Sequence, residues 1–157
     1  IGVGINTGSV IIGTVGSSER MDSTVLGDNV NVASRLQELT KIFGVRILIS
    51  EQTASALRDQ ASFALRELGA VTVRGRQRPV RLYEVMNADP PELCQQKQAT
   101  RLLHEDALAH YRNGDFSEAA RLWRECLVLA PDDSVPRYWL QCCERPDPTR
   151  QTLGVIV

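Results

Sequence analysis

The sequence predicts an α+β domain followed by a small all-helical tail. Residues 1–86 alternate short β-rich runs with amphipathic helical runs, whereas the residues after about 92 show helical patterns alone. The segment Asp89-Pro-Pro91 separates the two parts, because consecutive prolines make a stiff break. We therefore predict a domain at 1–87, a linker at 88–98, a helical hairpin at 99–145 and a final tail at 146–157.

Two β-rich runs open the chain, Ile1 to Asn6 and Val10 to Val15, and Gly8 between them is expected to turn a hairpin. A helix is expected from Asp28 to Phe43. Its apolar stripe consists of Val32, Leu36, Leu39 and Phe43, and Gly44 is placed to end it. Further along, the patterns predict a strand at 45–49, a helix at 51–58 and strands at 63–68, 71–73 and 80–86.

Glycines are frequent near the start, but neither GxGxxG nor GxxxxGK followed by Ser or Thr is present. We interpret them structurally: Gly13 or Gly16 permits close backbone approach or a bend in the second strand. Asp28 could be a metal ligand, yet its position before the helix favours an N-cap.

The most informative segment runs from Thr24 to Arg35, where a glycine turn leads into the expected helix. Asn31 and Arg35 are four residues apart, so their polar groups can converge on one ligand. A guanidinium matches phosphate oxygens, and an amide suits a sugar or a base edge, which together suggest a phosphorylated nucleotide. The alternative is a solvated Asn31 and an Arg35 that forms only a surface ion pair.

Six ordered motifs place residues 1–86 close to one known family. They are Gly2-Val-Gly-Ile-Asn-Thr-Gly8, Val10-Ile-Ile-Gly13, Val15-Gly-Ser17 with Arg20-Met-Asp22, the segment 24–35, Gly44-Val-Arg-Ile-Leu-Ile-Ser50, and Val73-Arg-Gly-Arg76 leading into Val80-Arg-Leu-Tyr-Glu-Val85. The segment resembles the C-terminal half of the class III nucleotidyl cyclase catalytic domain, the adenylyl and guanylyl cyclase family. This resemblance implies a ferredoxin-like domain, truncated at its N-terminus.

The resemblance also implies roles for individual residues. Asn31 would orient the ribose and Arg35 would stabilise charge on the α-phosphate. Thr24 matches the position that contacts the purine, where a hydroxyl favours adenine over guanine. In the arginine-rich hairpin, Arg74 is the best match to the residue that reaches the terminal phosphates, with Arg76 next. The alternatives are a strand residue for Thr24 and a solvated turn for the arginines.

In this family two catalytic domains pair head to tail, and each site takes residues from both. The metal-binding aspartates and a purine-specifying lysine belong to a segment before Ile1, so no metal ligand is assigned within this chain. We expect an adenylate cyclase fragment, inactive alone, whose intact form converts ATP to cyclic AMP as a homodimer with Mg²⁺ or Mn²⁺. A non-catalytic regulatory partner, or a protein that acts through its tail, is the alternative.

Composition agrees with an ordinary globular protein: 157 residues are 43% hydrophobic and 24% charged, with a net charge of −1 that argues against nucleic-acid binding. No apolar run approaches the roughly 18–20 residues of a membrane helix. The four cysteines form no CxxC pair, which predicts reduced thiols and a cytoplasmic location.

The tail resembles a single tetratricopeptide repeat, with Asn113-Gly-Asp-Phe116 as the turn between two helices. The matching positions are Leu103, Ala107, Gly114, Ala119, Trp123, Cys126 and Pro131, while Tyr111 falls one residue away from the usual aromatic position. One repeat cannot bury its own apolar face, so a third helix near 134–143 or a partner is expected to cover it. Either the tail binds a protein partner or it is a hairpin that packs on the cyclase domain.

Overall fold

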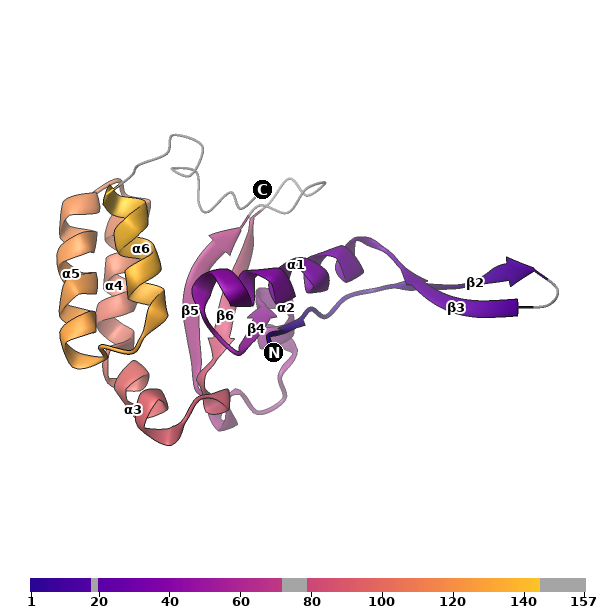
Figure 1. The fold of residues 1–157 in the computed structure, drawn as a ribbon, viewed down its shortest axis with the longest axis horizontal. Helices are drawn as coiled ribbons and strands as arrows, with labels where there is room; N and C mark the ends of the chain where they lie inside the picture. Colours follow the sequence, from indigo (N-terminus) through magenta and orange to yellow (C-terminus); the bar gives the residue numbers. More distant parts are fainter. Residues whose placement is uncertain (18–19, 72–78, 145–157) are drawn as a thin grey trace.

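A four-stranded sheet forms the centre of the molecule (Figure 1). The computed structural model describes residues 1–17, 20–71 and 79–144. The sheet has the order β1-β4-β6-β5, with β1 and β4 parallel and the other neighbours antiparallel. Its strands are β1 (Val3–Ile5), β4 (Ile47–Ser50), β6 (Val80–Val85) and β5 (Leu65–Val71). The predicted α+β class is therefore confirmed for this part of the chain.

A second sheet, of two strands, projects from the body as a long arm (Figure 1). Strand β2 (Ile11–Ser17) pairs antiparallel with β3 (Arg20–Leu26), so that Ile11 faces Leu26. The prediction of a hairpin around Gly8 is wrong, because the second β-rich run pairs with β3, for which the sequence patterns predicted no strand. Gly8 is instead needed for close packing: a Cβ there would lie 2.2 Å from Nδ2 of Asn29.

Helix α1 (Asp28–Phe43) lies across the sheet, with its N-terminal end toward the arm and its C-terminal end toward the tail (Figure 1). The predicted stripe is confirmed, since Val32, Leu36, Leu39 and Phe43 are all buried. Gly44 ends the helix as predicted, in a left-handed conformation with φ 67°. Asp28 is not the cap: Gly27 occupies that position with φ 142°, and Asp28 is the first helical residue.

The predicted helix at 51–58 is shorter in the structure, where α2 spans Glu51–Ala56. The Ser50 hydroxyl caps it by accepting a hydrogen bond from the Thr53 amide at 3.2 Å. Most of the strand expected at 63–68 and Val71, the first residue of the strand expected at 71–73, belong to one strand, β5, whose register with β6 shifts between Glu67 and Gly69. Residues 72 and 73 lie outside the described residues. Gly69 has φ 120° and lies at this register shift. The interruption of the β pattern at this glycine therefore marks an irregularity within one strand and not the end of a strand. Two short 3₁₀ helices, η1 (Gln60–Ser62) and η2 (Met86–Ala88), flank this region.

Four helices follow the sheet: α3 (Pro91–Ala99), α4 (Arg101–Arg112), α5 (Phe116–Leu129) and α6 (Ser134–Glu144). Helix α3 occupies most of the expected linker at 88–98, and the expected third helix of the tail is α6. Helix α5 lies farthest from the sheet (Figure 1). In the part of the chain that the structure describes, no helix combines the length and apolar character needed to cross a membrane.

Helices α4 and α6 pack directly on the sheet. A Cβ at Gly69 of β5 would lie 2.9 Å from the Trp139 ring of α6 and 4.0 Å from Leu108 of α4. Trp139 stacks on the fully buried Trp123, with ring centroids 5.6 Å apart, and Tyr138 meets Phe43 of α1 edge-on at 4.7 Å. One apolar core therefore runs from α1 and the sheet through the tail.

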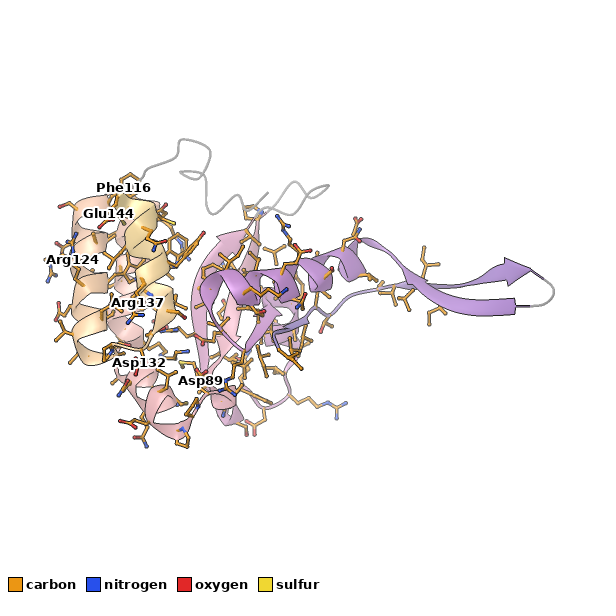
Figure 2. All side chains as sticks on the ribbon, in the orientation of Figure 1. Asp89, Phe116, Arg124, Asp132, Arg137 and Glu144 are labelled. Atoms are coloured by element: carbon orange, nitrogen blue, oxygen red, sulfur yellow. The ribbon has the colours of Figure 1, made fainter. Side chains whose placement is uncertain are left out.

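Buried ion pairs join the same two parts. Arg66 of β5 lies 2.5 Å from Glu84 of β6 and 2.5 Å from Asp133 in the turn before α6. Lys97 of α3 extends this network, at 2.5 Å from Glu84 and 2.6 Å from Asp89. All five side chains are at most 6% exposed. Figure 2 labels Asp89 at one end of the network and Asp132, the sequence neighbour of Asp133, near the other.

The network keeps Arg66 and Asp133 charged. Burial alone would lower the pKa of Arg66, but hydrogen bonds and charges of Asp133 and Glu84 outweigh burial and raise it. Burial likewise opposes ionisation of Asp133, yet the hydrogen bond and charge of Arg66 hold the pKa of that carboxyl below its usual value. A change that removes one partner therefore leaves a buried charge uncompensated.

We expect Arg66→Met to lower the free energy of unfolding by about 3–5 kcal/mol, because Glu84 and Asp133 lose their shared cation inside the protein. Arg121→Met is the matched control: Arg121 is exposed and, among the residues that the structure describes, pairs with carboxylates of its own helix, so its loss should change the free energy of unfolding far less. Urea unfolding measures both. Equal effects of the two substitutions would contradict this account of the network.

His104 of α4 is buried and neutral. The Trp123 indole N–H donates to its Nδ1 at 3.0 Å, so the imidazole proton is on Nε2, which lies 3.0 Å from the Glu67 carbonyl oxygen and donates to it. Burial, followed by the charge of Arg66, lowers the pKa of His104 from 6.5 to about 3. Folding thus keeps this imidazole from binding a proton.

Stability should consequently fall as the pH drops below 6.5, because the unfolded chain then protonates His104 and the folded chain does not. Between pH 7.5 and 4.5 this one group should remove about 2–3 kcal/mol from the free energy of unfolding. Nitrogen NMR of the imidazole tests the cause: His104 should keep its Nε2–H tautomer down to about pH 4. A titration near pH 6.5 in the folded protein would disprove it.

Candidate active site

The first turns of α1 form the candidate site. Gly27 has φ 142° and makes the sharp turn from β3 into the helix, where the Val30 amide donates to the Gly27 carbonyl at 3.0 Å. Asn31 is exposed and Arg35 is half-buried, one residue before Val32 and Leu36 of the buried stripe, respectively. The structure thus brings these two side chains to one side of the helix, beside the core, as their spacing predicted.

Arg35 has a local ion-pair partner. Its Nη1 atom lies 2.7 Å from Oε2 of Glu38, three residues further along the helix. This is the surface pair that the sequence left open as an alternative. A partly exposed pair of this kind contributes about 0–1 kcal/mol, so exchanging this carboxylate for a phosphate costs little. The pair is therefore compatible with ligand binding.

Residues 6–9 attach the start of α1 to the main sheet. The Asn6 side chain donates from Nδ2 to both the carbonyl oxygen and Oδ1 of Asn29, at 3.1 Å each. Asn29 in turn donates from its own Nδ2 to the Ser9 carbonyl at 2.7 Å. No local sequence pattern predicted this pair of asparagines; the signal that could have revealed it is Gly8, which has no room for a Cβ beside Asn29.

The other expected ligand contacts lie partly outside the described residues. Thr24 is in β3, opposite Gly13 and four residues before α1, and the structure describes its backbone only. Gly13 itself has open space where a Cβ would be, so close approach does not explain it. Arg74 and Arg76 belong to residues 72–78, outside the described part.

Metal ligands were expected from a segment before Ile1. Within residues 1–17, 20–71 and 79–144, no group of three or more His, Cys, Asp and Glu side chains is arranged to hold a metal ion. These residues do not form a metal centre by themselves.

Residues 1–87 match the family described as the adenylate and guanylate cyclase catalytic domain. The match covers more than half of the chain, which therefore belongs to this family.

Relatives share this part of the chain, and one shares more. The chain is 35% identical over 143 residues to the terminal-differentiation specific adenylate cyclase of Dictyostelium discoideum, across 90% of this chain and 7% of that protein. It is 48% identical over 86 residues to an adenylate cyclase of Anabaena cylindrica, across 54% of this chain and 17% of the relative. The chain thus spans less than a fifth of either protein. The Dictyostelium alignment necessarily includes residues beyond 87, so its similarity extends into the helical tail.

The crystal structure of the adenylyl cyclase CyaB from P. aeruginosa is 37% identical to this chain. That alignment covers 55% of this chain and 41% of the other, with a TM-score of 0.44.

Asn29 and Asn31 lie two residues apart on α1, and we expect only Asn29 to be needed for stability. We expect Asn29→Ala to lower the free energy of unfolding by about 1–2 kcal/mol, because it removes the hydrogen bonds to Ser9 and Asn6. Asn31→Ala, two residues away on an exposed position, should change it by less than about 0.5 kcal/mol. Urea unfolding of both variants measures the difference, and a larger loss for Asn31→Ala would contradict it.

Proposed function

We propose that this chain supplies one half of an adenylate cyclase active site, which converts ATP to 3′,5′-cyclic AMP and diphosphate. The observation that supports this proposal is the joint placement of Asn31 and Arg35 on one accessible side of α1, within a domain of the cyclase family. Relatives named as adenylate cyclases, from Dictyostelium and Anabaena, support the choice of ATP.

The proposed chemistry uses the two side chains differently. Cyclisation moves negative charge onto the α-phosphate and the leaving diphosphate, and catalysis of such a transfer depends on positioning and on donors aimed at that charge. Arg35 is the donor that stabilises the α-phosphate. Asn31, one helical turn earlier, orients the ribose so that its 3′-oxygen faces the phosphorus.

Base and terminal phosphates would be bound by residues outside this helix. Thr24 precedes α1 by four residues, and we propose that its hydroxyl accepts a hydrogen bond from the adenine amino group. Selectivity for ATP over GTP would follow, because a site built for one hydrogen-bonding edge leaves polar groups unpaired with the other base. Arg74 and Arg76 are the candidates for the terminal phosphates.

The other half of the site would come from a second cyclase domain, most simply in a homodimer. The arm supports pairing, since Ile11, Ile12 and Val25 expose 70%, 73% and 47% of their surface. That second half would also bring the carboxylates that bind Mg²⁺ or Mn²⁺. The described sheet would then be part of a complete ferredoxin-like domain.

For the tail, we propose a tetratricopeptide-like hairpin, α4 and α5, closed by α6. Ala107, Ala119, Trp123 and Cys126, at repeat-like positions, are all fully buried. The side formed by α4 and α6 is covered by β5 of the same chain, through Gly69. Of the two roles left open by the sequence, this packing favours a hairpin docked on the cyclase domain over a surface for a protein partner.

The direct test is Arg35→Ala in the intact enzyme that contains this chain. We expect kcat to fall by about 10²–10³, with KM for ATP within about threefold, because the guanidinium acts mainly on charge that develops in the transition state. Arg124→Ala, on the outer helix α5 (Figure 2), is the matched control and should leave both constants unchanged. A loss confined to KM would show that Arg35 binds only the ground-state phosphate.

Glu38→Gln tests the ion pair by itself, since it removes the Glu38 carboxylate beside Arg35 and keeps the guanidinium. Steady-state kinetics of this variant should give kcat within about threefold of wild type, because a partly exposed pair contributes little; a loss as large as that of Arg35→Ala would contradict the role given to the guanidinium.

A further inference from the structure

The end of α1 opposite the candidate site is held by the tail. The Ser134 hydroxyl, at the first residue of α6, donates to the Phe43 carbonyl at 2.6 Å and lies 3.2 Å from the Gly44 carbonyl. These carbonyls belong to the C-terminal turn of α1, where helical hydrogen bonds run out. A Cβ at Gly44 would lie 2.7 Å from the Ser134 hydroxyl oxygen, so the Ser134 side chain lies directly against the Gly44 backbone.

The same short turn is fixed to the sheet. Asp133, the residue before Ser134, forms the buried ion pair with Arg66 of β5 and accepts a hydrogen bond from the Val135 amide at 3.2 Å. Consecutive residues of one turn therefore bind the central sheet and the end of α1. The turn defines where α1 ends relative to β5.

We propose that the turn between α5 and α6 is a clamp that sets the position of α1, and that Ser134 is thereby a positioning residue for Asn31 and Arg35. The proposal rests on the function proposed above. Asn31 lies twelve residues before Phe43, about 18 Å along a helix that rises 1.5 Å per residue. A helix is stiff over this length, so a displacement at its clamped end moves its other end too.

The aromatic contact of Tyr138 with Phe43 strengthens the clamp from the next turn of α6. At its opposite end α1 is held by Asn6, through the backbone and side chain of Asn29. The helix that presents the candidate site is therefore anchored once by the cyclase part and once by the tail. The tail becomes a component of the catalytic geometry, besides being a stabilising addition.

The test compares Ser134→Ala with Ser117→Ala in the intact enzyme. Ser117 is exposed on the outer helix α5 and provides the same chemical change away from the clamp. We expect Ser134→Ala to lower kcat about three- to tenfold with KM for ATP within about twofold, since small misplacement of reacting groups affects turnover more than binding. Hydrogen exchange of the amides of residues 31–35 should quicken in Ser134→Ala and not in Ser117→Ala. Tyr138→Leu, which removes the ring against Phe43, should change kcat and exchange in the same direction.

Arg35→Ala, measured in parallel, separates this inference from the function on which it rests. If Arg35→Ala lowers kcat by about 10²–10³ while Ser134→Ala and Tyr138→Leu keep wild-type kcat and exchange, the clamp is wrong and the proposed function stands. If Arg35→Ala retains wild-type turnover, the proposed function is wrong, and faster exchange at residues 31–35 in Ser134→Ala then supports the clamp as a structural device alone. A fall in kcat matched by an equal change for Ser117→Ala would also overturn the clamp.

Discussion

The buried pairing of Arg66 with Glu84 and Asp133 is the interaction on which the rest of the structure depends. Arg66 and Glu84 belong to the sheet, while Asp133 comes from the tail, 67 residues away from Arg66 in the chain. A buried network of this kind need not stabilise a protein more than apolar packing would, but it penalises every arrangement that leaves one of its charges unpaired. Lys97 and Asp89 apply the same restriction to α3. The network therefore specifies how the tail docks.

One consequence is that cyclase part and tail behave as a single structural unit. The aromatic core crosses the boundary through Trp139 and Gly69, and Ser134 binds the end of α1. The sequence similarity to the Dictyostelium adenylate cyclase also continues beyond residue 87, as we expect if the two parts form one unit. The helix with Asn31 and Arg35 thus depends on contacts from both parts.

Local periodicity explains what the sequence could predict. The stripe of α1 and the helix end at Gly44 follow from spacing within one element, as does the placement of Asn31 and Arg35 on one side of α1. Strand β3, the packing of Gly8 on Asn29 and the partners of Arg66 depend on residues distant in the chain, whose pairing no local pattern encodes. Lys97 lies in a segment expected to be a linker, where a lysine is normally solvated. Its burial follows only from the tertiary contacts with Glu84 and Asp89.

Native-state hydrogen exchange tests the central claim, that sheet and tail form one cooperative unit, most directly. The free energy of opening is measured separately for the slowest amides of β4 and β6 and for those of α4 and α5. If the buried network and shared core join the two parts, both sets should open with the same free energy and the same denaturant dependence. Tail amides that open at a free energy well below that of the sheet, without exposing it, would contradict the account.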